Sequence, residues 1–281
     1  MDSLTGKTAV VTGGGSGIGR GMALRFARAG MNVVVADIDE QSMATVVDEV
    51  EAMGVKGLAV ATDVADPAAN QALADATVTA FGQANVICLN AGVTGSIGQS
   101  WTLTEEDWDW SLGILLNGVI NGIRSFVPGL VDHGDGHVVI TSSIVGHVSA
   151  PFSAPYAVAK HGVAALAESL HHELRIDRST VGVTCLCPGF VNTNIITAAR
   201  ARPDDSPGSA LDDHAERWLD ISEPGISSGI DPEIVGDLVH DAVLANQFWL
   251  FTDHAWDDSV ERRTQEIINR LPPTMGRPSL S

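Results

Sequence analysis

Short apolar segments alternate along the chain with longer segments of helical periodicity, and this order limits the possible folds most. Seven segments rich in Val, Ile, Ala, Leu and Cys have the length of strands: 8–12, 32–37, 57–61, 85–90, 136–142, 181–187 and 248–252. Most are nearly continuous in apolar residues, which is typical of parallel strands covered on both faces. Six further segments carry apolar residues at helical spacing: 17–29, 39–53, 67–81, 107–131, 153–175 and 232–245. This order predicts an α/β fold with a doubly wound parallel sheet and helices on both faces.

The composition limits the classes of partner. A chain of 281 residues with 44% hydrophobic content can bury a sizeable core, as one large domain or two small ones. Sixteen basic residues against 35 acidic ones give a formal net charge of −19, and the acidic residues are spread along the chain. We therefore expect a solvated acidic surface, and neither nucleic acid nor a membrane as a partner.

The cysteines and the N-terminal segment predict a cytoplasmic location. The start, MDSLTGKTAVV, lacks the pattern of an export signal, and no stretch of about 20 apolar residues is present. Cys88, Cys185 and Cys187 lie inside apolar runs, and no second Cys/His pair stands at zinc-site spacing. We expect a reduced protein without disulfides and without a metal site.

Two segments lack regular periodicity. Residues 192–229 are rich in Asp, Ser, Pro and Gly but contain Trp218, and an insertion of this length is usually a functional lid or a disordered loop. The final PPTMGRPSLS is expected to be loosely held. The resulting division is a catalytic domain over 1–255, with a substrate-binding lid at 192–229, and a C-terminal helix and tail over 256–281.

A glycine-rich turn, TGGGSGIGRG, joins the first predicted strand to the first predicted helix. Gly13, Gly17 and Gly19 allow a tight turn and a close approach to a pyrophosphate at the helix N-terminus. Asp37 follows Gly19 by 18 residues and ends the second strand, where a carboxylate accepts hydrogen bonds from ribose hydroxyls. Ser16 and the ADIDE segment offer no cation for a 2′-phosphate, so the pattern favours NAD over NADP; a role of Asp37 as a helix cap is compatible with this.

Tyr156, the single tyrosine of the chain, stands four residues before Lys160. Oxidation of a secondary alcohol needs a base near the hydroxyl, and a lysine on the same helix face favours the phenolate. Ser143 lies 13 residues before Tyr156 at a strand end, where its hydroxyl can hold the substrate oxygen. Asn117 lies in an apolar helical segment, where an amide needs a partner. Taken singly, Ser143 could simply end a strand and Asn117 could be a satisfied core amide.

These segments occur in the order and spacing of a known family. The motifs are TGGGSGIG (12–19), DV (63–64), NAG (90–92), LLNG with Asn117, ITSS with Ser143, YAVAK (156–160) and PGFVNT (188–193). Over about residues 5–255 the chain resembles the short-chain dehydrogenase/reductase family. The resemblance implies one Rossmann-like domain with a seven-stranded parallel sheet, in homotetramers or homodimers. Leu89 departs from the family pattern, which often has a further Asn before Asn90.

The resemblance also implies roles for individual residues. Asn117, Ser143, Tyr156 and Lys160 would form the catalytic group, with Asn117 holding a water that links Lys160 to solvent. Asp63 would meet the adenine ring and Thr193 the carboxamide. The full set expected to bind the cofactor NAD is Gly13, Ser16, Gly17, Ile18, Gly19, Asp37, Asp63, Val64, Asn90, Ala91, Gly92, Tyr156, Lys160, Pro188, Gly189, Val191 and Thr193.

The expected activity is an NAD(H)-dependent interconversion of a secondary alcohol and a ketone. The expected substrate-binding residues are Ser143, Val145, His147, Phe152, Tyr156 and Trp218. Apolar residues in the lid favour a hydrophobic or cyclic small molecule. A sugar-alcohol dehydrogenase, a 3-oxoacyl thioester reductase and a non-catalytic dinucleotide-binding regulator remain as alternatives.

Overall fold

A seven-stranded parallel sheet with the strand order β3-β2-β1-β4-β5-β6-β7 forms the centre of the protein in a computed structural model. The structure describes residues 3–195, 202 and 213–278. The strands are β1 (Thr8–Thr12), β2 (Asn32–Asp37), β3 (Gly57–Ala61), β4 (Val86–Leu89), β5 (His137–Thr141), β6 (Gly182–Cys187) and β7 (Trp249–Phe251). The first three have the predicted bounds, and the other four are one or two residues shorter. The predicted fold class is therefore confirmed.

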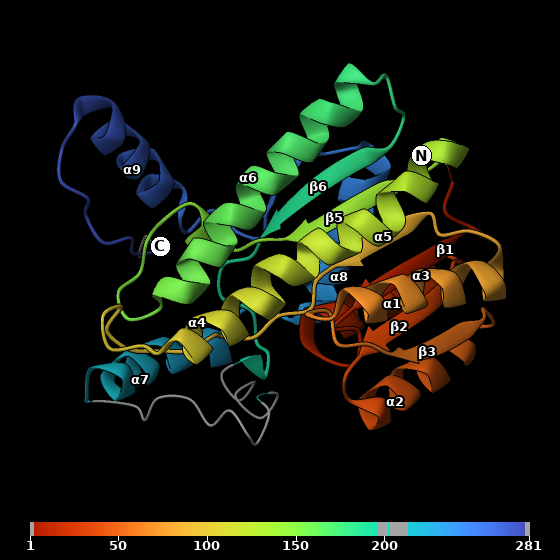
Figure 1. The fold of residues 1–281 in the computed structure, drawn as a ribbon, viewed down its shortest axis with the longest axis horizontal. Coiled ribbons are helices and arrows are strands. Elements are labelled where there is room, and N and C mark those ends of the chain that lie inside the picture. The colour runs from red at the N-terminus through yellow and green to blue at the C-terminus, as the bar shows by residue number, and fades with distance from the viewer. Residues whose placement is uncertain (1–2, 196–201, 203–212, 279–281) are drawn as a thin grey trace.

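Helices cover both faces of this sheet (Figure 1). They are α1 (Gly17–Arg28), α2 (Glu40–Glu51), α3 (Pro67–Phe81), α4 (Glu105–Leu112), a π-helical turn η1 (Gly113–Asn117), α5 (Gly118–His133), a 3₁₀ turn η2 (Ile144–Gly146), α6 (Ala154–Ile176), α7 (Asp213–Ser227), α8 (Pro232–Ala245) and α9 (Asp257–Asn269). The apolar core on one face joins α1, α2 and α8 to the sheet, and the core on the other face joins α3, α5 and α6 to it. Successive residues of the central strands are therefore buried on opposite sides, which explains their continuous apolar sequences.

The helix starts follow from local chemistry. Asp39 accepts hydrogen bonds from the backbone N–H groups of Gln41 and Ser42, and Asp66 accepts one from Ala68. Proline stands in the first turn of α3, where the missing N–H has no helical partner to lose. The predicted acidic caps are thus confirmed.

The strand order reverses beside β1, because β4 pairs with β1 on the side opposite to β2. In a doubly wound sheet, this reversal opens a crevice at the carboxyl ends of the strands. The glycine-rich turn, Asp37 and the loops after β4, β5 and β6 all lie at this edge.

The segments predicted to be irregular are more ordered than expected. Within 192–229, α7 is helical, whereas 196–201 and 203–212 lie outside the described residues. The C-terminal tail is bound along α9: the backbone N–H of Thr274 donates to Glu266, and that of Arg277 donates to Ser259. Tertiary hydrogen bonds of this kind leave no local pattern in the sequence.

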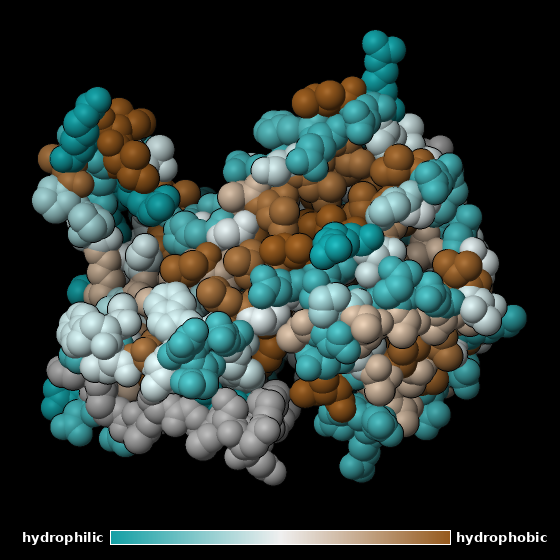
Figure 2. Space-filling view, in the orientation of Figure 1, coloured by the Kyte–Doolittle hydropathy of each residue, from teal (hydrophilic) through white to brown (hydrophobic). Residues whose placement is uncertain are grey.

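The predicted helix 107–131 is the central part of a longer run of helix from Glu105 to His133, which the π-helical turn η1 interrupts. By length and composition alone this run could cross a membrane. In the fold, however, α5 packs against α3 and β4, and its buried apolar residues belong to the protein core. Figure 2 shows hydrophobic residues gathered over α5 and α6, where Val131 and Val158 are exposed.

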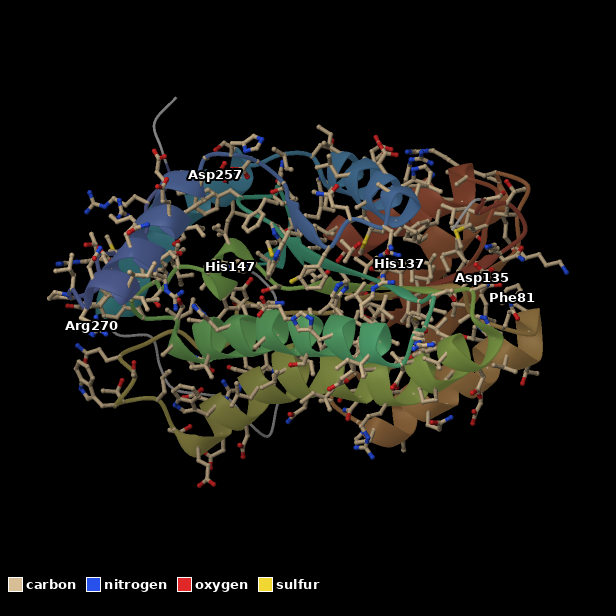
Figure 3. The ribbon with its side chains drawn as sticks, turned by 90° about the horizontal axis from the view of Figure 1, so that it is seen from above. Phe81, Asp135, His137, His147, Asp257 and Arg270 are labelled. Carbon is tan, nitrogen blue, oxygen red and sulfur yellow. The ribbon has the colours of Figure 1, made fainter. Side chains whose placement is uncertain are left out.

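Labelled residues in Figure 3 identify the two ends of the sheet. Phe81, Asp135 and His137 mark the amino-terminal edge of the sheet, and α9, between Asp257 and Arg270, lies at the other end of the molecule.

His137 is buried in the first position of β5, and its Nε2 lies 2.8 Å from the Thr184 hydroxyl. Because that hydroxyl donates to the carbonyl of Gln247, the imidazole Nε2 is the donor. Burial is the main cause that lowers the pKa of His137 to about 3.

We expect His137 to make the protein sensitive to acid. The pKa of His137 is lower in the folded than in the unfolded state. Its contribution to the free energy of unfolding is therefore complete above the unfolded pKa and is lost as the pH falls toward the folded pKa. Between pH 7 and pH 5 one such group lowers the free energy of unfolding by about 2 kcal/mol. Urea unfolding of His137→Gln should show a smaller loss between these pH values. His254→Gln, at an exposed histidine, is the control. Equal losses of unfolding free energy in the wild type and both variants would contradict this role of His137.

Candidate active site

A cavity of about 870 Å³ runs along the carboxyl ends of the strands. One end is formed by the glycine-rich turn and Asp37, and the other by residues after β5, from α7 and near the C-terminus. All seventeen residues expected to bind the cofactor line this cavity. The structure thus brings them together; their role in binding remains a prediction.

The glycine-rich turn has the shape that a dinucleotide needs. Gly13 has φ +63°, and a Cβ there would lie 2.8 Å from the Cα of Ala91. The Asp37 carboxylate accepts a hydrogen bond from the Gly15 N–H at 3.0 Å, which fixes the turn against the end of β2. The N-terminus of α1 begins after Ser16 and supplies backbone donors and a partial positive charge for a pyrophosphate. These residues fit a dinucleotide.

A hydrogen-bond network joins the ends of β1, β4 and β5. The Thr12 hydroxyl donates to the carbonyl of Cys88 and accepts from the N–H groups of Asn90 and Ala91. The Asn90 amide donates to the carbonyl of Thr12, and its oxygen accepts from the Thr141 hydroxyl. Asn90 therefore fixes the floor of the cavity between the glycine-rich turn and the end of β5.

Ser143, Tyr156 and Lys160 converge on the same cavity. A side-chain hydrogen bond links Tyr156 to Ser143. Lys160 Nζ lies 5.7 Å from the centre of the Tyr156 ring and donates to the carbonyl of Thr141 at 2.8 Å. The hydroxyl of Ser142 donates to the Lys160 carbonyl and holds α6 against the end of β5.

The pKa shifts differ from the sequence-based expectation. Burial raises the pKa of Tyr156, and the hydrogen bond with Ser143 lowers it by less. Burial also lowers the pKa of Lys160 to about 8. Desolvation dominates at Tyr156, and the Lys160 ammonium group is directed to a backbone carbonyl, so the tyrosine pKa lies above its usual value and not below it as expected. Tyr156 is therefore a neutral phenol at neutral pH.

The structure contradicts the placement of Asn117. Its side chain is exposed and lies outside the cavity, whereas Leu115, two residues earlier, is buried and lines it. Both residues belong to η1, and residues two apart on a helix point in different directions. Leu115 packs with Val93 and Ala159, so the side of the cavity near Lys160 is apolar where an amide was expected.

Two of the expected substrate-binding residues also lie elsewhere. The ring of His147 packs against Trp249 and Phe251 at centroid distances of 5.1 and 5.3 Å, and its Nε2 lies 3.2 Å from the Cys187 sulfur. Burial lowers its pKa to about 4, so it is a neutral packing residue. Phe152 has φ +61° and does not line the cavity; its carbonyl accepts from the N–H of Gly98.

The far end of the cavity is mainly apolar. Val145 and Trp218 line it as expected. Sequence reasoning missed other residues there, namely Trp110, Val148, Phe190, Trp256 and Gly276, and it also missed Leu115 on the side near Lys160. The irregular spacing of these residues in the sequence gives no local signal, although three of them are aromatic residues.

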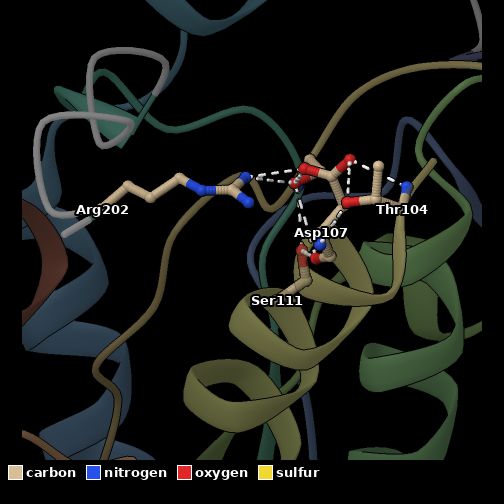
Figure 4. A network of polar contacts seen from close by, with 5 residues as sticks. Thr104, Asp107, Ser111 and Arg202 are labelled. Carbon is tan, nitrogen blue, oxygen red and sulfur yellow. Dashed lines mark hydrogen bonds and ion pairs between the residues drawn. The ribbon is translucent and has the colours of Figure 1, made fainter. Parts of the chain in front are cut away.

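A buried ion pair joins the chain between β6 and α7 to α4 (Figure 4). Arg202 Nη1 donates to Asp107 Oδ1 at 2.7 Å and to the Ser96 hydroxyl at 3.0 Å. Asp107 is buried and also completes the capping box of α4 with Thr104. The Arg202 guanidinium lies 5.0 Å from the ring centre of Trp110, which lines the cavity. The ion pair thus positions one wall of the cavity.

Comparisons with known proteins agree with this geometry. A family model described as short chain dehydrogenase matches residues 7–204. A short chain dehydrogenase/reductase from Burkholderia phymatum, solved in complex with NAD, is 37% identical, with a TM-score of 0.94 and full coverage of both chains.

Two curated relatives are similar over most of the chain. The C alpha-dehydrogenase of Sphingobium sp. strain SYK-6 is 30% identical over 279 residues, 99% of this chain and 90% of the relative. The 1-deoxy-11-beta-hydroxypentalenate dehydrogenase of Streptomyces avermitilis is 34% identical over 248 residues, 88% of this chain and 84% of the relative.

We expect Arg202→Met to lower the free energy of unfolding by about 3 kcal/mol, because it leaves the buried Asp107 carboxylate without its cation. Asp107→Asn should cost less in the Arg202→Met background than in the wild type, by about 1–3 kcal/mol. Urea unfolding of the two single variants and the double variant measures this coupling. Strictly additive changes would show that the pair does not stabilise the fold.

Proposed function

The chain belongs to the short-chain dehydrogenase/reductase family, and on this premise we propose that it is an NAD(H)-dependent oxidoreductase that interconverts a secondary alcohol and a ketone. The observation that carries the proposal is the position of Ser143, Tyr156 and Lys160 in one cavity with the glycine-rich turn. The bound nicotinamide would accept or supply the hydride, and the protein residues would orient the substrate and move the proton.

Asp37 supports the choice of NAD. Its carboxylate lines the cavity at the end of β2, next to β3, and is held by the N–H groups of Gly15, Ile38 and Asp39. A fixed carboxylate there can accept ribose hydroxyl donors and repels a 2′-phosphate. The NAD complex of the Burkholderia phymatum relative supports the same choice.

The proton would move through Tyr156. In the direction of reduction, the neutral phenol donates its proton to the ketone oxygen, while the Ser143 hydroxyl holds that oxygen in place. In the direction of oxidation, the phenolate accepts the alcohol proton. The Lys160 ammonium, fixed on the carbonyl of Thr141, adds a positive charge beside the phenolate and stabilises it.

The apolar end of the cavity favours a hydrophobic or cyclic substrate. Trp110, Phe190 and Trp218 line the space beyond the catalytic residues. The name of one relative, 1-deoxy-11-beta-hydroxypentalenate dehydrogenase, supports a hydroxylated organic substrate. A sugar alcohol would leave many hydroxyls without partners at such a wall, so we rank it and a 3-oxoacyl thioester lower.

We further propose a homodimer or homotetramer. The hydrophobic residues that gather over α5 and α6 in Figure 2 give each subunit an apolar face, and Val131 and Val158 are exposed there. A symmetric assembly would cover such a face on each subunit.

We expect Tyr156→Phe to bind NADH as the wild type does and to lose at least about 100-fold in kcat, because the proton donor is absent. Fluorescence titration with NADH measures binding, and NADH absorbance with a panel of hydrophobic alcohols and ketones measures turnover. His161→Gln, on the same helix, is the control. Unchanged turnover in Tyr156→Phe would remove Tyr156 from the mechanism, and NADH binding without turnover of any panel member by the wild type would favour a non-catalytic regulator.

We expect Asp37→Asn to reduce the preference for NAD over NADP at least about ten-fold, because the fixed negative charge beside the ribose is lost. The ratio of kcat/KM values for the two cofactors measures this preference. Asp39→Asn keeps an oxygen acceptor for the cap of α2 and is the control. Better use of NADP than NAD by the wild type would overturn the assignment.

A further inference from the structure

We propose that the C-terminal tail, residues 274–277, forms the outer wall of the substrate site, and that Gly276 allows this wall to lie against the loop after Ser143. The inference rests on the proposed function, because it requires that the substrate binds at the end of the cavity beside the tail. It assigns a specificity-determining role to a segment that a sequence alone presents as a loose end.

Gly276 lies where the tail reaches the cavity. It lines the same space as Ser143, Val148 and Trp256. A Cβ at Gly276 would stand 2.9 Å from the Cβ of Val148 and 3.0 Å from its Cγ2, closer than side chains pack. The absence of a side chain therefore lets the tail backbone touch Val148, which follows η2 and Ser143 in the chain.

Hydrogen bonds from α9 hold the tail in this position. The buried Ser259 hydroxyl donates to the carbonyl of Arg277 at 2.6 Å and accepts from the N–H of Arg277 at 3.1 Å. Glu266 accepts from the N–H of Thr274, and Arg262 donates to the carbonyl of Met275. Four hydrogen bonds between three residues of α9 and three residues of the tail are more than a fraying terminus retains.

The helix that carries these groups is itself fixed to the catalytic loops. Trp256, directly before α9, is buried with Ile144 and Val148, and its ring packs edge-on against Phe190 at 5.7 Å. Ile144 follows Ser143, and Phe190 follows the end of β6. Any shift of α9 and the tail would therefore change the distance from the outer wall to the catalytic serine.

The chemistry of the wall indicates what it contacts. Val148 and Trp256 present apolar surface, and Gly276 presents backbone with no side chain. The matching part of a substrate is an apolar ring or alkyl group at a distance from the reacting carbon. A small alcohol would occupy the space near Ser143 and Tyr156 without reaching the tail.

The first test loosens the tail without touching the catalytic residues. Ser259→Ala removes both hydrogen bonds to Arg277, and Thr264→Ala, on the same helix but bonded only to the carbonyl of Val260, is the matched control. The probes are α-methylbenzyl alcohol and its para-phenyl derivative, with saturating NAD. In Ser259→Ala we expect KM for the two-ring alcohol to rise about five-fold, with little change in kcat, in KM for the one-ring alcohol or in KM for NAD. Equal changes for both alcohols, or none, would overturn the proposal.

The second test does not need turnover. In Val148→Cys/Gly276→Cys the two Cβ atoms need to separate by less than about 1 Å to reach disulfide spacing. Mild oxidation should form this disulfide within minutes, detected by mass spectrometry, while Gly276→Cys with only the buried Cys88, Cys185 and Cys187 should form none. Failure of the pair to cross-link would overturn the placement of the tail. If the wild type turned over neither alcohol but the disulfide formed, the proposed substrate class would fail and the wall would stand.

Discussion

The hydrogen bonds of Thr141 connect the two halves of the active site. Its side chain donates to Asn90, which is bonded to Thr12 at the start of the glycine-rich turn. Its backbone carbonyl accepts from Lys160 on α6. One residue at the end of β5 therefore sets both the floor under the dinucleotide and the position of the charged group beside Tyr156. The sheet provides the rigidity that this connection needs, because β5 is paired on both sides.

Burial in the site also disfavours the charged forms of Lys160 and Tyr156. Lys160 is 4% exposed, and desolvation lowers its pKa to about 8 and raises that of Tyr156. Because the pKa of Lys160 lies close to neutral pH, small changes around its ammonium group have large effects on the fraction of Lys160 that is charged. The carbonyl of Thr141 favours the charged form and thus offsets part of the desolvation.

The sequence was most informative where structure is local. Continuous apolar strands, acidic caps and the glycine-rich turn depend on near neighbours, and the structure has them where they were predicted. Asn117 was placed wrongly because the register of η1 decides whether residue 115 or residue 117 faces the cavity, and one interrupted turn changes that register. His147 was placed wrongly because the packing of Trp249 and Phe251 turns its ring away from the cavity.

The two ends of the cavity differ in how far apart their residues lie in the chain. The end with the proposed catalytic residues comes from Ser143, Tyr156 and Lys160, within 18 residues of one another. The outer end comes from Trp110 and from Gly276, which are 166 residues apart. Each is held in place by polar contacts that the neighbouring sequence does not predict. Motifs can therefore identify the reaction, whereas the substrate depends on contacts that only the folded chain makes.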